Sequence, residues 1–235
     1  MEALFRKFQI NLRIGDVYKM SEEELGHFQA AMAEFSRRLG KGPKGTKLVQ
    51  AVYAIVDGLT AQYLTNHQIA CKKGCGWCCY QLVCSTTLEM RLIVDYLSSL
   101  QRRQRSQICH QASEKARLFY LQNQKLLTSN RRWQEIGEGL RIRHHGKPCV
   151  FLSDDSVCGI YPVRPIDCRS ARSLDSCGKY TGEKPQLRKV SFIFDQVASN
   201  LIMDEEEKTS GGRNIVPLIG WPISQQFGWF FDRYK

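Results

Sequence analysis

Four cysteines fall within nine residues of this chain, in the segment CKKGCGWCC at residues 71–79. Clustered thiols can close disulfides, bind a metal as thiolates, or exchange electrons as a dithiol pair. Two residues separate Cys75 from Cys78, which is the spacing of a chelating pair, and the glycines at 74 and 76 let backbone N–H groups approach the sulfur atoms. The members of this first cysteine group are Cys71, Cys75, Cys78 and Cys79.

A second cysteine group follows a change of sequence texture at Pro148. Its members are Cys149, Cys158, Cys168 and Cys177, separated by nine, ten and nine positions. Both groups lie in segments expected to be loops, so a fold that brings them together could hold one or more metals. Because neighbouring side chains diverge in most backbone conformations, we expect Cys78 and Cys79 to serve two metals, or one cluster and its surroundings.

The cellular compartment decides among the thiol chemistries. The N-terminal segment has no uninterrupted apolar run and no small-residue cleavage site, so it does not read as a secretory signal. No stretch approaches the roughly 18 uncharged apolar residues of a membrane span. These features predict a soluble, cytoplasmic protein without a membrane partner. Structural disulfides are rare in that reducing compartment, so the ten cysteines favour a metal.

Three chemistries stay open at this point. Zinc takes four thiolates, or three and a histidine, and eight cysteines suffice for two such sites. An iron–sulfur cluster also takes four cysteines and leaves the others to tune or protect it. A redox pair at Cys75 and Cys78 is disfavoured, because the preceding strand and the helix start that lower a thiol pKa in thioredoxin-like sites are missing from the sequence pattern. Thiolates suit zinc and iron alike.

The elements that must position these thiols are mostly helical. Apolar residues recur at spacings of three and four behind capping boxes at Ser21–Glu24 and Thr86–Glu89, and after the glycine-rich loop that ends at Gly45. The fold class is therefore mainly α, with a cysteine-rich region of loops and a small hairpin. The predicted helices cover residues 22–39, 46–67, a stretch from 87 to about 100, then about 105–128, 130–143 and 187–201.

The second half combines short elements with turns. Val150–Leu152 and Ile160–Tyr161 flank a turn at 153–156 and predict a small hairpin, and Pro165 opens a short helix. The acidic and glycine-rich run at 204–214 predicts a linker or exposed loop, and the aromatic tail beyond it should pack back over the core. The expected organisation is N-terminal helices at 1–70, a cysteine-cluster domain at 71–180, and a C-terminal helix and tail at 181–235 on the same core.

The chain is basic, with a formal net charge of +11 from 34 Lys and Arg against 23 Asp and Glu. Solvated helix faces explain such charge more often than nucleic-acid binding, although a nucleic-acid partner stays open as an alternative. Nearby Arg and Lys would also offset the negative charge of thiolates and lower their pKa values. The expected partners are metal ions and a protein or small-molecule substrate.

Taken together, CKKGCGWCC, PCVFL at 148–152 and CGIYPVRPIDCR at 158–169 resemble the YkgJ-type cysteine-cluster family, described as zinc- or iron-chelating domains. The resemblance spans roughly residues 71–177, with Cys177 matching more loosely. It implies metal ligation by Cys71, Cys75, Cys78, Cys79, Cys149, Cys158 and Cys168, with Tyr161, Arg164 and Arg169 close to the site. These arginines would donate to sulfur or hold a substrate carboxylate, or else pair with Asp154, Asp155 or Asp167.

The resemblance extends to flagellin lysine methylases, whose cysteine pattern implies an iron–sulfur cluster, of the 4Fe-4S type, and methyl transfer from S-adenosylmethionine. This chain is short for such an enzyme and shows no separate G-x-G-type loop. The first expectation is therefore a protein that holds an iron–sulfur cluster, zinc or iron. The alternatives are an iron–sulfur enzyme such as a protein N-methyltransferase, and a nucleic-acid-binding protein with structural zinc.

Four residues near the pattern lie outside it. Cys109 falls in a helical stretch and should be a packed small hydrophobe rather than a ligand. Cys84 lies between the first group and a helix cap, and we favour a role other than metal ligand for it. His144 and His145 precede the second group in a basic stretch, where we expect exposed side chains although either histidine could complete a site.

Overall fold

The protein is mainly α, as predicted, in a computed structural model that describes residues 22–40, 42–64, 75–127, 129, 139–140, 144, 146–173, 193–212, 215–224 and 226–233. The α-helices are α3 (Glu22–Leu39), α4 (Thr46–Leu64), α5 (Thr87–Ser99), α6 (Arg102–Leu127), α8 (Ile166–Ser170), α9 (Ile193–Ser210) and α10 (Gly228–Asp232). The 3-10 helices are η1 (Trp77–Tyr80), η2 (Tyr161–Val163) and η3 (Leu218–Ile223), and the strands are β1 (Cys84–Thr86) and β2 (Ile215–Pro217).

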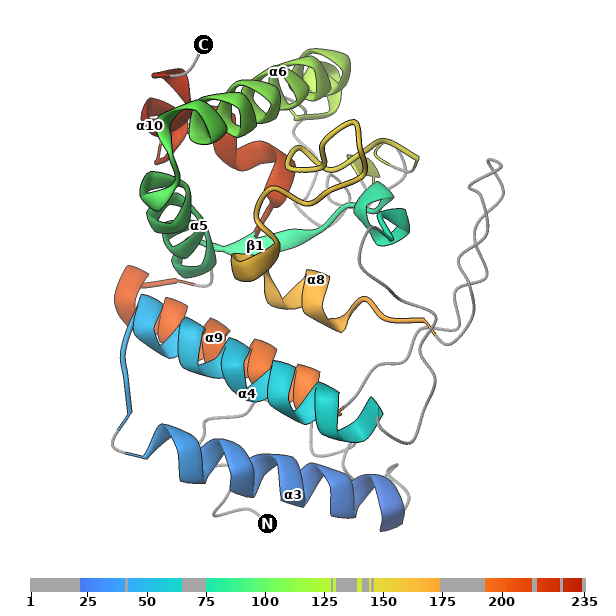
Figure 1. Ribbon diagram of the computed structural model, residues 1–235, viewed down its shortest axis with the longest axis vertical. Coiled ribbons are helices and arrows are strands. Elements are labelled where there is room, and N and C mark those ends of the chain that lie inside the picture. Colours follow the sequence, from blue (N-terminus) through green and yellow to red (C-terminus); the bar gives the residue numbers. More distant parts are fainter. Residues whose placement is uncertain are drawn as a thin grey trace.

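Three helices form the lower part of the molecule in Figure 1, where α4 and α9 lie side by side above α3. The three-four spacing of apolar residues gives each helix one face that must be buried, and these faces meet in one hydrophobic cluster. Fully buried examples are Phe35 of α3, Val56 of α4 and Ile202 of α9. The helices predicted at 22–39 and from Thr46 are confirmed. The capping box predicted for the first of them depends on Ser21 and on the Glu24 side chain, which lie outside the described part of the structure.

The acidic run after residue 203 is not a linker, contrary to the sequence-based prediction. Asp204, Glu205 and Glu206 continue α9 to Ser210 and are buried. The reason is a long-range demand for hydrogen-bond acceptors at two helix N-termini. Glu205 accepts from the Gly45 N–H at the start of α4 (2.7 Å), and Glu206 accepts from the Leu88 N–H in the first turn of α5 (2.9 Å).

The upper part of Figure 1 contains α5, α6 and the C-terminal segment with η3 and α10. Their apolar side chains form a second hydrophobic cluster, which includes the buried Trp221 and Phe231 of the aromatic tail. The aromatic tail thus packs in the second cluster, beside α6. Trp221 also donates its indole N–H to the Ser85 hydroxyl (2.7 Å), so the tail is hydrogen-bonded to β1 as well as packed against α6.

A short antiparallel pair joins the tail to the middle of the chain. β1 pairs with β2, with Cys84 opposite Pro217, Ser85 opposite Val216 and Thr86 opposite Ile215. The sequence pattern did not predict these strands, because three residues are too few for a recognisable alternation. The predicted capping box is confirmed at the end of β1, where the Thr86 hydroxyl accepts from the Glu89 N–H and Glu89 accepts from the Thr86 N–H.

The other predicted elements agree with the structure in part. α6 begins at Arg102 and ends at Leu127, close to the predicted stretch, whereas most of 130–143 lies outside the described residues. The hairpin at 150–161 is reduced to a single antiparallel bridge between Leu152 and Cys158, because residues 161–163 form η2 instead of a strand. Among the described residues, no helix is both long and apolar enough to cross a membrane.

Candidate metal centre

The backbone brings the two cysteine groups against each other. η1 curls the chain through Cys78 and Cys79, and the Cys149 N–H donates to the carbonyl of Cys79 across 2.7 Å. A second bond joins the Gly146 N–H to the Tyr80 carbonyl at 3.3 Å. The first and second groups are therefore neighbours in space although about 70 residues separate them in the sequence.

A turn with a hairpin-like shape carries Cys149 and Cys158 on its two arms. The Gly159 N–H donates to the Phe151 carbonyl (2.8 Å) and the Ser153 N–H to the Val157 carbonyl (2.9 Å), closing the turn. Gly76 packs against this turn so closely that a Cβ there would lie 3.5 Å from both Leu152 and Ser156. The loop of the first group and the turn of the second are therefore in direct packing contact.

Cys168 arrives from a different element. It lies in α8, whose N-cap is Pro165, and its N–H donates to the Pro165 carbonyl (3.0 Å). The fixed φ of proline suits a helix start, so the RP-x-x-C sequence itself sets the position of this cysteine relative to η2. The short predicted helix after Pro165 is confirmed, and it ends at Ser170.

Five described thiols lie within electrostatic range of one another: Cys78, Cys79, Cys149, Cys158 and Cys168. All are free and half-buried. The Cys79 thiol donates a hydrogen bond to the Cys78 sulfur, which lowers the pKa of Cys78 and raises that of Cys79. The two side chains therefore meet instead of diverging, and the expectation that they serve two metals, or one cluster and its surroundings, stays a prediction.

The remaining thiols of the cluster are held in their neutral form. Burial raises the pKa of Cys149 to about 12, and burial also raises the pKa of Cys158 and of Cys168. The negative charge that neighbouring thiolates would carry adds to the shift at each position. A metal cation reverses this penalty, because it replaces the protons and neutralises the crowded sulfur charges.

Arg164 faces the thiols. Its positive charge lowers the pKa of Cys78 and of Cys158, although other causes are larger at both. The guanidinium stacks on the Tyr161 ring at 4.2 Å, and its buried Nε has no hydrogen-bond partner. Tyr161 itself is 57% exposed, so its ring covers the arginine from the solvent side. Arg164 is thus a cation available to sulfur.

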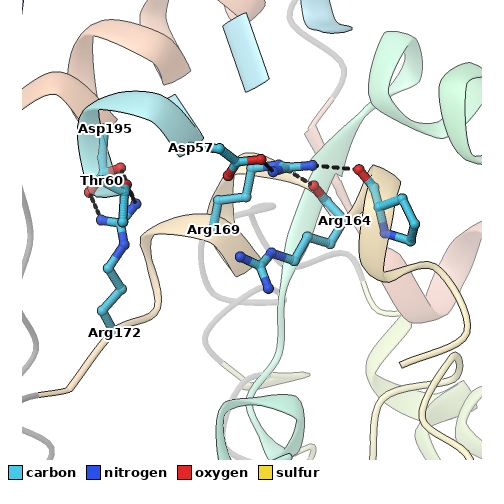
Figure 2. A network of polar contacts seen from close by, with 7 residues as sticks. Asp57, Thr60, Arg164, Arg169, Arg172 and Asp195 are labelled. Carbon is cyan, nitrogen blue, oxygen red and sulfur yellow. Dashed lines mark hydrogen bonds and ion pairs between the residues drawn. The ribbon is translucent and has the colours of Figure 1, made fainter. Parts of the chain in front are cut away.

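Arg169 and Arg172 face the helices instead, as Figure 2 shows. Arg169 forms an ion pair with Asp57 of α4. Arg172 binds Asp195 of α9 through both terminal nitrogens (2.7 and 3.2 Å) and donates to the Thr60 hydroxyl (2.7 Å). For Arg169, the carboxylate in this ion pair is therefore Asp57 and not one of the expected partners Asp154, Asp155 and Asp167. The segment 164–172 is thereby fastened to the lower helices.

Glu89 fastens the same segment from another side. Its carboxylate is almost completely buried and accepts from the Tyr53 hydroxyl (2.9 Å), the Ile166 N–H (2.8 Å) and the Thr86 N–H (2.8 Å). Burial raises its pKa, against the three hydrogen bonds. One side chain thus joins α4, the start of α5 and the start of α8, which is the helix of Cys168.

The predicted site residues differ in how far the structure describes them. Cys71 and Cys177 lie outside the described residues, and Cys75 is half-buried beside Gly76. In the part of the chain that the structure describes, no three His, Cys, Asp or Glu side chains are already close enough to hold one metal ion. The five clustered thiols are thus neighbours with the donor chemistry of a soft metal, and not a finished ligand set.

Sequence reasoning missed Asp57, Glu89 and Asp195 as partners of the site. Asp57 carried a signal, because it is the one acidic residue in the apolar segment from Thr46 to Leu64. Glu89 was assigned to its capping box alone. Cys109, predicted as a packed hydrophobe, is fully buried as expected. Cys84 lies apart from the thiol cluster, and burial raises its pKa to about 11, with Asp167 as the next cause.

His144 is buried, which corrects the expectation of an exposed side chain. It is 2% exposed and contacts the Phe119 ring edge-on at 5.5 Å between centroids, because α6 presents an apolar face to this segment. Its Nδ1 has no hydrogen-bond partner. Burial lowers the pKa to about 4, and Lys147 adds to the shift. His145 lies outside the described residues.

We expect His144 to make the protein acid-sensitive. Its pKa is lower in the folded chain than in the unfolded one, so the unfolded state takes up the proton first and stability falls as the pH drops from about 6.5 towards 4. The full effect is at most about 3 kcal/mol. Urea titrations of the wild type and of His144→Phe at pH 7.5, 6 and 5 measure it. An equal loss of stability in both proteins would contradict this assignment.

Half-buried free thiols, drawn from two loops and fastened to a helical scaffold, are typical of a protein that binds a thiophilic metal. The comparison with protein families agrees: residues 70–190 match the family described as "CxxCxxCC: Putative zinc- or iron-chelating domain". The match covers half of the chain, and the protein belongs to this family. The comparisons with curated proteins and with solved structures found no match.

Proposed function

We propose that the protein holds a thiolate metal centre shared by its two cysteine groups. The proposed ligands are drawn from Cys71, Cys75, Cys78, Cys79, Cys149, Cys158, Cys168 and Cys177. The observation that carries the proposal is the meeting of five free thiols from three separate elements, η1, the turn at 149–158 and α8. Membership of a family of zinc- or iron-chelating domains supports the same chemistry.

The number of thiols favours a centre with more than one metal atom. A zinc ion takes four ligands in a closed structural site, and five described thiols already interact before Cys71, Cys75 and Cys177 are considered. The closeness of Cys78 and Cys79 argues against two distant sites, since both sulfurs face the second group. An iron–sulfur cluster, or two zinc ions that share the site, fits this crowding.

The residues around the thiols have separate roles in this proposal. Arg164 donates to sulfur and offsets the negative charge of the bound thiolates, because its Nε is buried without another partner. Tyr161 shields that arginine from water. When bound, zinc would cross-link the loops, whereas an iron–sulfur cluster would add one-electron chemistry. Methyl transfer, nucleic-acid binding and the narrower likeness to YkgJ-type proteins and flagellin lysine methylases stay predictions from the sequence.

Metal analysis of the full chain tests the proposal. Protein purified without oxygen should contain stoichiometric zinc or iron, with more than one metal atom per chain. A brown colour with broad absorbance near about 400 nm and acid-labile sulfide would identify an iron–sulfur cluster, and a colourless zinc protein would identify the alternative.

Two results would count against the proposal. Protein that binds neither metal, with its cysteines fully reactive towards a thiol reagent, would remove the metal centre altogether. A single metal atom per chain would keep the centre and remove its polynuclear character.

A further inference from the structure

Arg169 directly follows the proposed ligand Cys168, yet its guanidinium binds backbone carbonyls and a carboxylate. The side chain is 3% exposed. Its Nε donates to the Arg164 carbonyl (3.0 Å), one terminal nitrogen donates to the Pro162 carbonyl (2.7 Å), and the other pairs with Asp57. The guanidinium also lies over the Tyr53 ring, 4.1 Å from its centroid.

The two carbonyls show what these contacts do. Pro162 and Arg164 lie between the proposed ligands Cys158 and Cys168, Pro162 within η2 and Arg164 in the bend that joins η2 to α8. By donating to both, Arg169 closes this bend on itself. By pairing with Asp57 and stacking on Tyr53, it fixes the closed bend to α4 (Figure 2). The spacing of the two cysteines is thereby coupled to α4.

We propose that Arg169 is a positioning residue of the metal centre and that Asp57 completes it from α4. The inference rests on the proposed function, because it assumes that Cys158 and Cys168 bind the metal. It goes beyond that function in two ways. It separates the two arginines of the RPIDCR segment, with Arg164 acting on the sulfurs and Arg169 acting on the backbone. It also makes α4, which precedes the family match at 70–190, part of the metal-binding unit.

Arginine is required here by geometry rather than by charge. The planar guanidinium holds five donors in a fixed fork, so a single side chain can serve two carbonyls and a carboxylate in different directions. A lysine has one ammonium on a flexible stem and cannot reach all three at once. The exchange Arg169→Lys therefore keeps the positive charge and removes the clamp.

The experiment uses the full chain, stripped of metal under reducing conditions and titrated with Co²⁺, whose absorption reports ligand geometry. We compare the wild type with Arg169→Lys and with Asp57→Asn, which alters the exposed end of the clamp. Arg172→Lys is the matched control, since Arg172 is also buried and paired with an aspartate but forms its contacts after α8. Urea unfolding of the four metal-free proteins records stability separately.

Loss of a residue that orients ligands typically weakens metal binding by about 10–100-fold. We expect such a loss for Arg169→Lys, with a changed cobalt spectrum, a smaller shift in the same direction for Asp57→Asn, and an unchanged spectrum for Arg172→Lys. Should Arg169→Lys fail to fold, the Asp57→Asn spectrum decides. Wild-type affinity and spectrum in both variants, or an equal change in Arg172→Lys, would overturn the positioning role. A wild type that takes up neither Co²⁺ nor an iron–sulfur cluster would instead overturn the proposed function.

Discussion

Replacing Cys149 with serine should remove stoichiometric metal from the purified full chain. Cys149 interacts electrostatically with Cys78, Cys79, Cys158 and Cys168, so it lies at the centre of the described thiols. A serine hydroxyl is a poor ligand for zinc and iron compared with the soft sulfur donors of the proposed site. The loss of affinity should exceed the 10-fold to 100-fold typical of residues that only orient ligands, that is, roughly 100-fold or more.

The backbone explains why this variant should still fold. The contact between the two groups runs through the Cys149 N–H and the Cys79 carbonyl, and a serine keeps it. Metal content per chain, measured by elemental analysis after purification, reports the result. Cys84→Ser is the matched control, because Cys84 is also half-buried but lies beside Asp167, apart from the thiol cluster. Wild-type metal content in Cys149→Ser, or equal losses in both variants, would contradict the assignment of Cys149 as a ligand.

Replacing Arg172 with methionine should destabilise the protein by about 3–5 kcal/mol. Arg172 and Asp195 are 7% and 4% exposed, and the guanidinium binds both carboxylate oxygens. Methionine fills much of the arginine volume but removes the guanidinium that binds both carboxylate oxygens of the buried Asp195, and breaking a buried ion pair in this way is costly. The free energy of unfolding, from urea titrations followed by circular dichroism, measures the effect.

Arg37→Met is the control for this second prediction. Arg37 pairs with Glu34 on the same helix, but its side chain is 70% exposed. Exposed ion pairs are screened by solvent and contribute little to stability, so this variant should differ little from the wild type. A change below about 1 kcal/mol for Arg172→Met as well would show that the Arg172–Asp195 pair does not stabilise the packing of the segment after α8 against α9.

The sequence predicted most of the helices correctly, because the signal for each is local. Apolar residues at three-four spacing identify α3, α4 and α6, and the Thr86–Glu89 capping box marks the start of α5. The two cysteine groups could be predicted for a related reason. The identity of a metal donor is a property of the side chain itself, so Cys-rich spacing indicates the chemistry before any fold is known.

The errors of sequence reasoning share a different origin. Asp204, Glu205 and Glu206 looked like a solvated linker, and His144 looked like an exposed base in a basic stretch. Neighbours that are distant along the chain account for these positions. The N–H groups of Gly45 and Leu88 donate to Glu205 and Glu206, and the Phe119 ring packs against His144. The polarity of the local sequence cannot reveal such partners, because a buried acidic residue and an exposed one have the same side chain.

By itself, the sequence determined the helical class, the soft sulfur donors and the two loops that carry them. Only the tertiary structure decided which charged side chains serve the thiols and which brace the scaffold. Arg164 and Arg169 are equivalent in the RPIDCR motif, yet one stacks on Tyr161 beside Cys78 and Cys158 and the other pairs with Asp57, 112 positions away. That choice depends on long-range packing of α8 against α4, because a guanidinium binds whichever acceptors the fold brings within reach.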